Sequence, residues 1–153
     1  MPKLASLPFV EDPATVHPVL GVPMHPYAHR NLGDLSDLTQ FGVHIERLPP
    51  GSASSLRHWH ETEDEFILML SGEVILREDG GETRLVAGDA ASWPAGVPDG
   101  HCLENRSDAP ATYLTVGTRN RADVIHYPDH DRICHKDGSA RRWTRGDGTA
   151  AAV

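Results

Sequence analysis

Four residues of this sequence have types and spacing that could hold a divalent metal ion: His58, His60, Glu65 and His101. His58 and His60 are two residues apart, so on a β-strand both imidazoles project from one face and Trp59 projects from the other. Glu65 follows the acidic turn ETED, which can fold back and bring a carboxylate beside the two imidazoles. His101 follows the turn GVPDG at the start of another predicted strand. Three imidazoles and a carboxylate suit Fe(II), Mn(II), Ni(II), Cu(II) or Zn(II), whereas calcium and magnesium prefer more oxygen ligands.

The His-x-His pair is weak evidence when it is taken alone. With ten histidines in 153 residues, roughly one such pair is expected by chance. The alternative interpretation is a set of histidines held by hydrogen bonds in the core. Glu65 and His101, at positions where strands begin, favour the metal site instead.

Short strands are predicted around these residues. Phe41, Val43 and Ile45 alternate with polar or small residues, which is the period-two pattern of a half-buried strand. Further apolar runs lie at 65–70, 73–77, 90–93, 101–106 and 111–118, and Asp79 with Gly80 predicts a hairpin turn. Because no amphipathic helix separates these runs, we expect an all-β sandwich or closed barrel.

Three segments are predicted along the chain. Residues 1–37 contain six prolines, so we expect an extended N-terminal arm that wraps the barrel and has few central strands. Residues 38–118 carry the strand pattern and form the barrel. Residues 119–153 are more polar, and we expect a C-terminal tail on the surface that frays at its end.

Two stretches resemble the paired motifs of the cupin superfamily. GSASSLRHWHETEDEFILMLSG, at 51–72, resembles the first cupin motif, with its HxH pair, glutamate and closing glycine in order. GDAASWPAGVPDGHCLEN, at 88–105, is similar to the second motif, although four residues separate Gly96 from His101 and make this loop longer than usual. The phrase NRSDAPATYLTVGTR followed by HYPD is similar to small single-domain bacterial cupins.

The resemblance implies a double-stranded β-helix, or jelly-roll barrel, with His58, His60, Glu65 and His101 as metal ligands. It does not imply one reaction, because cupins include dioxygenases, decarboxylases, isomerases, lyases and storage proteins. A single divalent transition metal (Fe, Mn, Ni, Zn or Cu) is the expected cofactor.

The predicted strand 65–70 has an apolar outer face. If Glu65 faces inward, alternation also places Ile67 and Met69 inside the barrel. The residues left on the outer face are Phe66, Leu68 and Leu70. Either the proline-rich arm or a second subunit must cover them, and we favour a homodimer, as the resemblance to cupins also suggests.

Composition restricts the partners and the location. A formal charge of −8 leaves no broad basic surface, so we expect neither nucleic acid nor a membrane as a partner. With no signal-peptide pattern at the N-terminus, we expect a cytoplasmic protein. Cys102 and Cys134 are expected to be reduced rather than bridged.

The leading hypothesis is a metal-dependent enzyme that acts on a small carboxylate, carbonyl or hydroxylated compound, by oxygenase, lyase or isomerase chemistry. His44 and Tyr113 are the candidate catalytic residues for acid and base work. The alternative is a binding or sensing module in which the ion anchors a metabolite without turnover.

Overall fold

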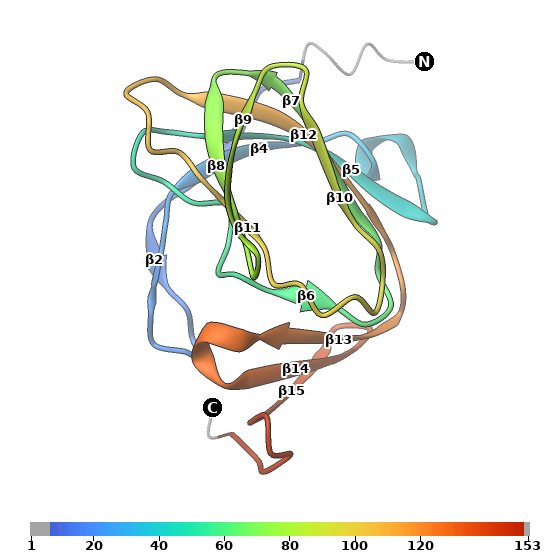
Figure 1. The fold of residues 1–153 in the computed structure, drawn as a ribbon. Coiled ribbons are helices and arrows are strands. Elements are labelled where there is room, and N and C mark those ends of the chain that lie inside the picture. Colours follow the sequence, from blue (N-terminus) through green and yellow to red (C-terminus); the bar gives the residue numbers. More distant parts are fainter. Residues whose placement is uncertain (1–6, 152–153) are drawn as a thin grey trace.

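A computed structural model describes residues 7–151, and almost all of its regular structure is β-strand (Figure 1). The largest sheet has the order β1-β4-β5-β12-β7-β10, and a smaller sheet has the order β11-β8-β9. The strands of the larger sheet are β1 (Val10–Asp12), β4 (Tyr27–Asn31), β5 (Phe41–Leu48), β7 (Glu65–Ser71), β10 (Ala90–Trp93) and β12 (Ala111–Thr118). Those of the smaller sheet are β8 (Glu73–Glu78), β9 (Gly81–Val86) and β11 (Cys102–Glu104). Every pair in both sheets is antiparallel.

The hydrophobic core lies between these two sheets. Leu48, Met69 and Tyr113 from the larger sheet pack in one cluster with Val74 and Leu103 from the smaller one. The two sheets therefore close on each other as a jelly-roll barrel, and the all-β, double-stranded β-helix prediction is confirmed. Within residues 7–151 the short helices η2 (Asp34–Ser36) and η3 (Pro128–His130) are far too short to span a membrane.

The side-chain alternation expected for β7 is also confirmed. Ile67 and Met69 are 5% and 1% exposed, whereas Phe66 and Leu70 on the other face are 39% and 44% exposed. Their exposure follows from the position of the arm, because β1 and β4 extend the sheet beyond β5, away from β7. The described part of the arm therefore does not cover this apolar face.

The N-terminal arm contributes more structure than the sequence indicated. Strands β2 (Thr15–Val16) and β3 (Pro23–Met24) form a small hairpin, and β4 pairs with both β1 and β5. Segment 27–31 has no proline, so every one of its amides can donate a hydrogen bond within the sheet. The expectation of few central strands is wrong for β4. Residues 1–6 of the predicted arm lie outside the described residues.

The segment predicted as a surface tail is mostly strand. It forms β13 (Ala122–Tyr127), β14 (Arg132–Asp137) and β15 (Ala140–Thr144), and β13 also pairs with β6 (Trp59–His60). Figure 1 shows this sheet closing the lower end of the barrel in that view. The sequence did not indicate these strands because polar strands satisfy their backbone by pairing, and such pairing leaves no apolar pattern in the sequence. The predicted fraying concerns the end of the chain, where 152–153 lie outside the described residues.

The two cysteines are separate and reduced in the structure. Cys102 and Cys134 are both buried and free, so no disulfide joins them. Burial raises the pKa of the Cys102 thiol to about 11, which keeps it in the thiol form at neutral pH.

The turn between β7 and β8 depends on a glycine. Gly72 has a φ of +75°, and a Cβ there would lie 2.6 Å from the carbonyl oxygen of Pro110 and 2.8 Å from the Cα of Ala111. We expect Gly72→Ala to lower the free energy of unfolding by about 2–4 kcal/mol, because the left-handed backbone and the overlap both cost energy. Gly80→Ala is the matched control, since nothing lies within 4 Å of a Cβ at that hairpin turn. Urea denaturation measures both, and equal losses would contradict this account.

Candidate metal centre

Backbone pairing brings the first and second histidine segments together. His58 and His101 form an isolated antiparallel bridge, in which the His101 amide donates to the His58 carbonyl at 2.9 Å and the reverse bond is 3.2 Å. His60 lies in β6, and Glu65 is the first residue of β7. The chain between them turns back through 61–64, as the acidic turn ETED indicated.

The three predicted histidine ligands lie around one oxygen of the fourth, Glu65. The Oε2 atom of Glu65 lies 2.8 Å from Nε2 of His101, 3.7 Å from Nε2 of His60 and 3.9 Å from Nε2 of His58. Donor atoms that share one transition-metal ion at about 2.1 Å lie roughly 3–4 Å from each other. Within this set of four, the donor atoms of His58, His60 and Glu65 all lie within 4.8 Å of one another. His101 joins the group through Glu65, and its longer loop does not turn the imidazole outward.

Each histidine uses its other ring nitrogen for a hydrogen bond away from the centre. Nδ1 of His58 faces the Leu56 carbonyl at 2.8 Å, and Nδ1 of His101 faces the Asp99 carbonyl at 3.2 Å. Nδ1 of His60 lies 2.5 Å from Oδ2 of Asp123. Carbonyl and carboxylate oxygens only accept, so each Nδ1 must carry a proton. In a neutral imidazole Nε2 then carries a free lone pair, as for His58 and His60, whereas Nε2 of His101 is hydrogen-bonded to Oε2 of Glu65 at 2.8 Å.

The positions of these donor atoms show whether the four residues fit a metal ion. The Nε2 atoms of His58 and His60 face the Oε2 atom of Glu65, which is also hydrogen-bonded to Nε2 of His101. Imidazole lone pairs beside a carboxylate repel it unless a positive charge lies among them. A divalent cation supplies that charge, and the outward bonds from Nδ1 are the usual way in which ligand imidazoles are oriented. The donor set therefore fits a divalent transition metal.

Burial and neighbouring charge set the protonation states of His58 and Glu65 that metal binding requires. Burial lowers the pKa of His58 to about 4, so this imidazole is neutral at pH 7. Burial raises the pKa of Glu65, but the hydrogen bond with His101 and the charges of the three histidines outweigh it and lower the pKa to about 2. A neutral imidazole beside an ionised carboxylate is the protonation state that binds metal.

Asp123 is a functional residue that the sequence analysis missed. Its side chain is fully buried on β13, and its Oδ1 atom also accepts hydrogen bonds from the amide and hydroxyl of Thr62. Burial opposes ionisation, but the bonds from His60 and Thr62 lower the pKa of Asp123. No spacing in the sequence links positions 60 and 123, because the pairing of β6 with β13 brings them together.

Asp123, His60 and Glu63 form a second group of close donor atoms. Glu63 already has a cation, because the Lys136 ammonium lies 2.5 Å from its Oε1 atom. We therefore regard this group as the support of His60 and not as a separate metal site.

Comparison with known proteins decides the family. A model of the cupin domain matches residues 44–117. A crystal structure from Silicibacter pomeroyi, named a sugar phosphate isomerase from a cupin superfamily, is 41% identical, with a TM-score of 0.87. The match covers 99% of this chain and 96% of that one. The chain belongs to the cupin superfamily.

Two further proteins are similar to this chain at lower identity. A protein of Thermotoga maritima named oxalate-binding protein is 34% identical over 70 residues, which are 46% of this cupin. The match spans only 55% of that relative's own length. A structure from Acidithiobacillus ferrooxidans is 23% identical over 84% of this chain and 81% of its own, with a TM-score of 0.78, and supports the fold alone.

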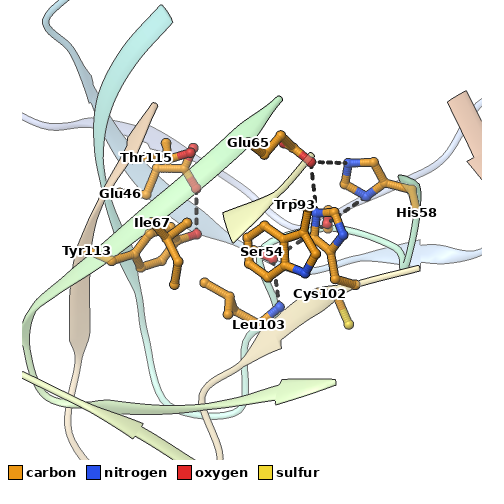
Figure 2. A pocket seen from close by; sticks show the side chains of 12 residues that line it. Glu46, Ser54, His58, Glu65, Ile67, Trp93, Cys102, Leu103, Tyr113 and Thr115 are labelled. Carbon is orange, nitrogen blue, oxygen red and sulfur yellow. Dashed lines mark hydrogen bonds and ion pairs between the residues drawn. The ribbon is translucent and has the colours of Figure 1, made fainter. Parts of the chain in front are cut away.

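The centre of this cupin opens into a cavity of about 160 Å³ inside the barrel (Figure 2). His58, Glu65 and His101 line it together with Trp93, whose ring stacks on His101 at 3.8 Å between centroids. Within residues 7–151, no lysine or arginine lines this cavity.

The structure treats the two candidate catalytic residues differently. Tyr113 lines the cavity, is 1% exposed and donates a hydrogen bond to Oε2 of Glu46 at 2.5 Å. His44 is on the same strand as Glu46 but is not among the lining residues; its charged neighbours include Asp34 and Arg119. A catalytic role for His44 stays a prediction that the position of this residue does not support. Glu46, which the sequence analysis did not select, lines the cavity, whereas His44 does not.

The lowered pKa of His58 predicts how the metal-free protein responds to acid. Between pH 6.5 and 4 the unfolded chain binds a proton at this residue and the folded protein does not, so stability falls as the pH falls through this window. We expect His58 to account for at most about 3 kcal/mol of that decline in the free energy of unfolding. His58→Gln should flatten the decline in urea titrations of chelator-treated protein. His25→Gln, at an exposed histidine, should keep it, and equal slopes for the two variants would contradict the burial of His58.

Proposed function

We propose that this cupin binds one divalent transition metal through His58, His60, Glu65 and His101 and acts as an enzyme on a small oxygen-rich organic substrate held at that ion. The observation that carries the proposal is the convergence of three Nε2 atoms on one carboxylate oxygen. Iron, manganese, nickel, zinc and copper all suit this donor set. When bound, such an ion polarises a carbonyl or carboxylate oxygen of the substrate.

The cavity supports a small carboxylate, carbonyl or hydroxylated compound as the substrate. Its volume of about 160 Å³ suits a molecule of few atoms. A phosphate group would find no lysine or arginine among the described residues that line this cavity, so the phosphate of a sugar phosphate would have to lie outside it. The name of the Thermotoga maritima relative makes oxalate a natural first probe.

The two candidate functions are an enzyme and a binding module, and the name of one relative supports each of them. The Silicibacter pomeroyi structure is named an isomerase, and the Thermotoga maritima protein is named a binding protein. We favour the enzyme, because the Silicibacter match extends over nearly the whole chain. The isomerase branch is then favoured over the oxygenase and lyase branches. A cytoplasmic location, and the lack of nucleic-acid and membrane partners, stay predictions.

A homodimer through the outer face of the larger sheet is part of the proposal. Cross-strand pairing aligns Val116 of β12 with Val43 and Phe66, and the register continues with Leu114 and Leu68. These side chains form an apolar surface that crosses three neighbouring strands. A second copy of the same sheet can cover it with a self-complementary contact about a two-fold axis.

The metal assignment predicts distinct effects for a ligand and its support. His60→Ala should abolish high-affinity metal binding and leave the barrel folded, because it removes a donor from the centre. Asp123→Asn should weaken binding by about 10–100-fold, because it removes the carboxylate that orients His60. Metal analysis of purified protein and chelator competition measure both. His130→Ala is the control, and a His60→Ala variant that binds metal as tightly as the wild type would refute the assignment.

Turnover separates the enzyme from the binding module. The metal found in protein purified without added metal is identified first, and the loaded protein is then mixed with oxalate, other small carboxylates and hydroxycarbonyl compounds. Isotope exchange or product formation followed by NMR supports the enzyme. Tight binding without any product supports the sensor.

The apolar face predicts that a single charge disrupts the dimer. Phe66→Arg should convert a dimer to a monomer of the same fold, because an arginine at the centre of the contact would be buried without a partner. Val16→Arg is the control, since Val16 is 60% exposed on β2, outside this sheet. Light scattering gives the mass and circular dichroism the fold. A monomeric wild type, or a dimeric Phe66→Arg variant, would exclude this interface.

A further inference from the structure

The cavity has a second polar end that the metal centre does not use. Glu46 on β5 and Tyr113 on β12 line it together with His58 and Glu65. Figure 2 shows Glu46 and Tyr113 on one side of the cavity and His58 and Glu65 on the other. A ligand held at the centre would therefore face the Glu46 carboxyl group.

Glu46 is a carboxyl group with no basic partner. Within residues 7–151, no lysine or arginine forms an ion pair with it, and its one hydrogen-bonded partner is the Tyr113 hydroxyl at 2.5 Å. An imidazole outside the centre that acts on Glu46 belongs to His29 of β4. Its Nδ1 atom lies 2.7 Å from Oδ2 of Asp12 on β1, so His29 is already paired. Two further acidic groups, Asp12 and Glu65 of β7, add negative charge around Glu46.

These surroundings favour the protonated form of Glu46. Burial raises the pKa of Glu46, and the charges of Glu65 and Asp12 act in the same direction. The hydrogen bond from Tyr113 and the charge of His29 oppose this shift without cancelling it. A carboxyl group with a raised pKa keeps its proton to higher pH than an exposed carboxyl group, so it can donate a proton as well as accept one.

We propose that Glu46 exchanges a proton with the ligand held at the histidine cluster, and that Tyr113 is the residue that positions Glu46 for this exchange. The inference rests on the proposed function, which supplies the ligand. In the forward direction the O–H bond of Glu46 breaks, and its proton forms a new bond to a basic atom of the ligand. The Tyr113 hydroxyl donates to the carboxylate that remains. The reverse step returns the proton, and no electrons are exchanged.

Alternation in the sheet explains why these two residues can cooperate. Tyr113 and Glu46 are directly opposite in the pairing of β12 with β5, and both side chains point into the barrel. His44 and Thr115 form the next inward pair of the same ladder, and of these only Thr115 lines the cavity. The geometry therefore assigns to Glu46 the acid and base work that the sequence assigned to His44.

The first test follows the proton directly by infrared spectroscopy of the metal-loaded protein. The wild type should show the carbonyl stretch of a protonated carboxylic acid up to a higher pH than exposed carboxyl groups do, and Glu46→Gln should lack this stretch while loading metal normally. Glu73→Gln is the matched control, because the Arg84 guanidinium lowers the pKa of this exposed carboxyl group and its loss should leave the band unchanged. If the band is absent from the wild type, with Glu46 ionised at pH 5 and above, the proposal is overturned.

Tyr113→Phe tests the positioning role with a readout that packing alone would not move. Removing a donor to the carboxylate disfavours the ionised form, so the titration of the Glu46 band should move to higher pH. A Tyr113→Phe variant that folds and titrates like the wild type would remove Tyr113 from the proposal.

The second test uses oxalate as the probe and measures its affinity against pH by calorimetry. Above the midpoint of Glu46 the wild-type affinity should fall about tenfold per pH unit, because an ionised Glu46 repels the dianion and has no proton to share. Glu46→Gln should bind with little dependence on pH across the same range. A parallel fall in both proteins would overturn the proposal.

The outcomes also separate this inference from the proposed function. Wild-type protein that fails to load metal would defeat the proposed function, whatever the state of Glu46. Loaded protein that does not bind oxalate would argue against that substrate class, and the infrared titration alone would then decide the role of Glu46.

Discussion

The crowding of a carboxylate and three imidazoles around one point inside a barrel is the constraint on which the rest of the structure depends. Glu65 is ionised, and the Nε2 atoms of His58, His60 and His101 lie 3.9, 3.7 and 2.8 Å from its Oε2 atom. In a low-dielectric interior such a group is costly unless a cation compensates it. The features around the centre can be understood as means of holding these four donors in place.

Rigidity of the centre comes from backbone pairing and from polar contacts behind the ligands. The His58–His101 bridge fixes two ligands against each other. The third ligand, His60, is held by Asp123, a residue of the sheet that closes one end of the barrel. Strands β13 to β15 are therefore part of the site, although they lie beyond the segment that matches the cupin model. A side chain that is held by such contacts loses less entropy when it binds an ion.

The cavity joins two environments of opposite character. At one end the histidines and Glu65 favour positive charge, and at the other Glu46 lies in surroundings that favour a bound proton. A small oxygen-rich molecule between them would contact a Lewis acid and a proton carrier at the same time. Such a combination can move protons on a carbonyl compound.

The sequence by itself determined the elements that depend on local pattern. Alternation predicted the strands and the inward face of β7. The spacing of His58, His60, Glu65 and His101, with the resemblance to the cupin motifs, indicated which residues would meet, because each lies in a strand or directly before one. The tertiary structure alone decided what depends on pairing between distant segments. Asp123 reaches His60 only because β13 pairs with β6, and of two residues on β5 only Glu46, not His44, lines the cavity. Polar strands leave no periodic apolar signal, and the partner of a buried carboxyl group depends on which residues lie close to it in three dimensions. Neither the contact of Asp123 with His60 nor the place of Glu46 in the cavity could therefore be predicted from the order of residues.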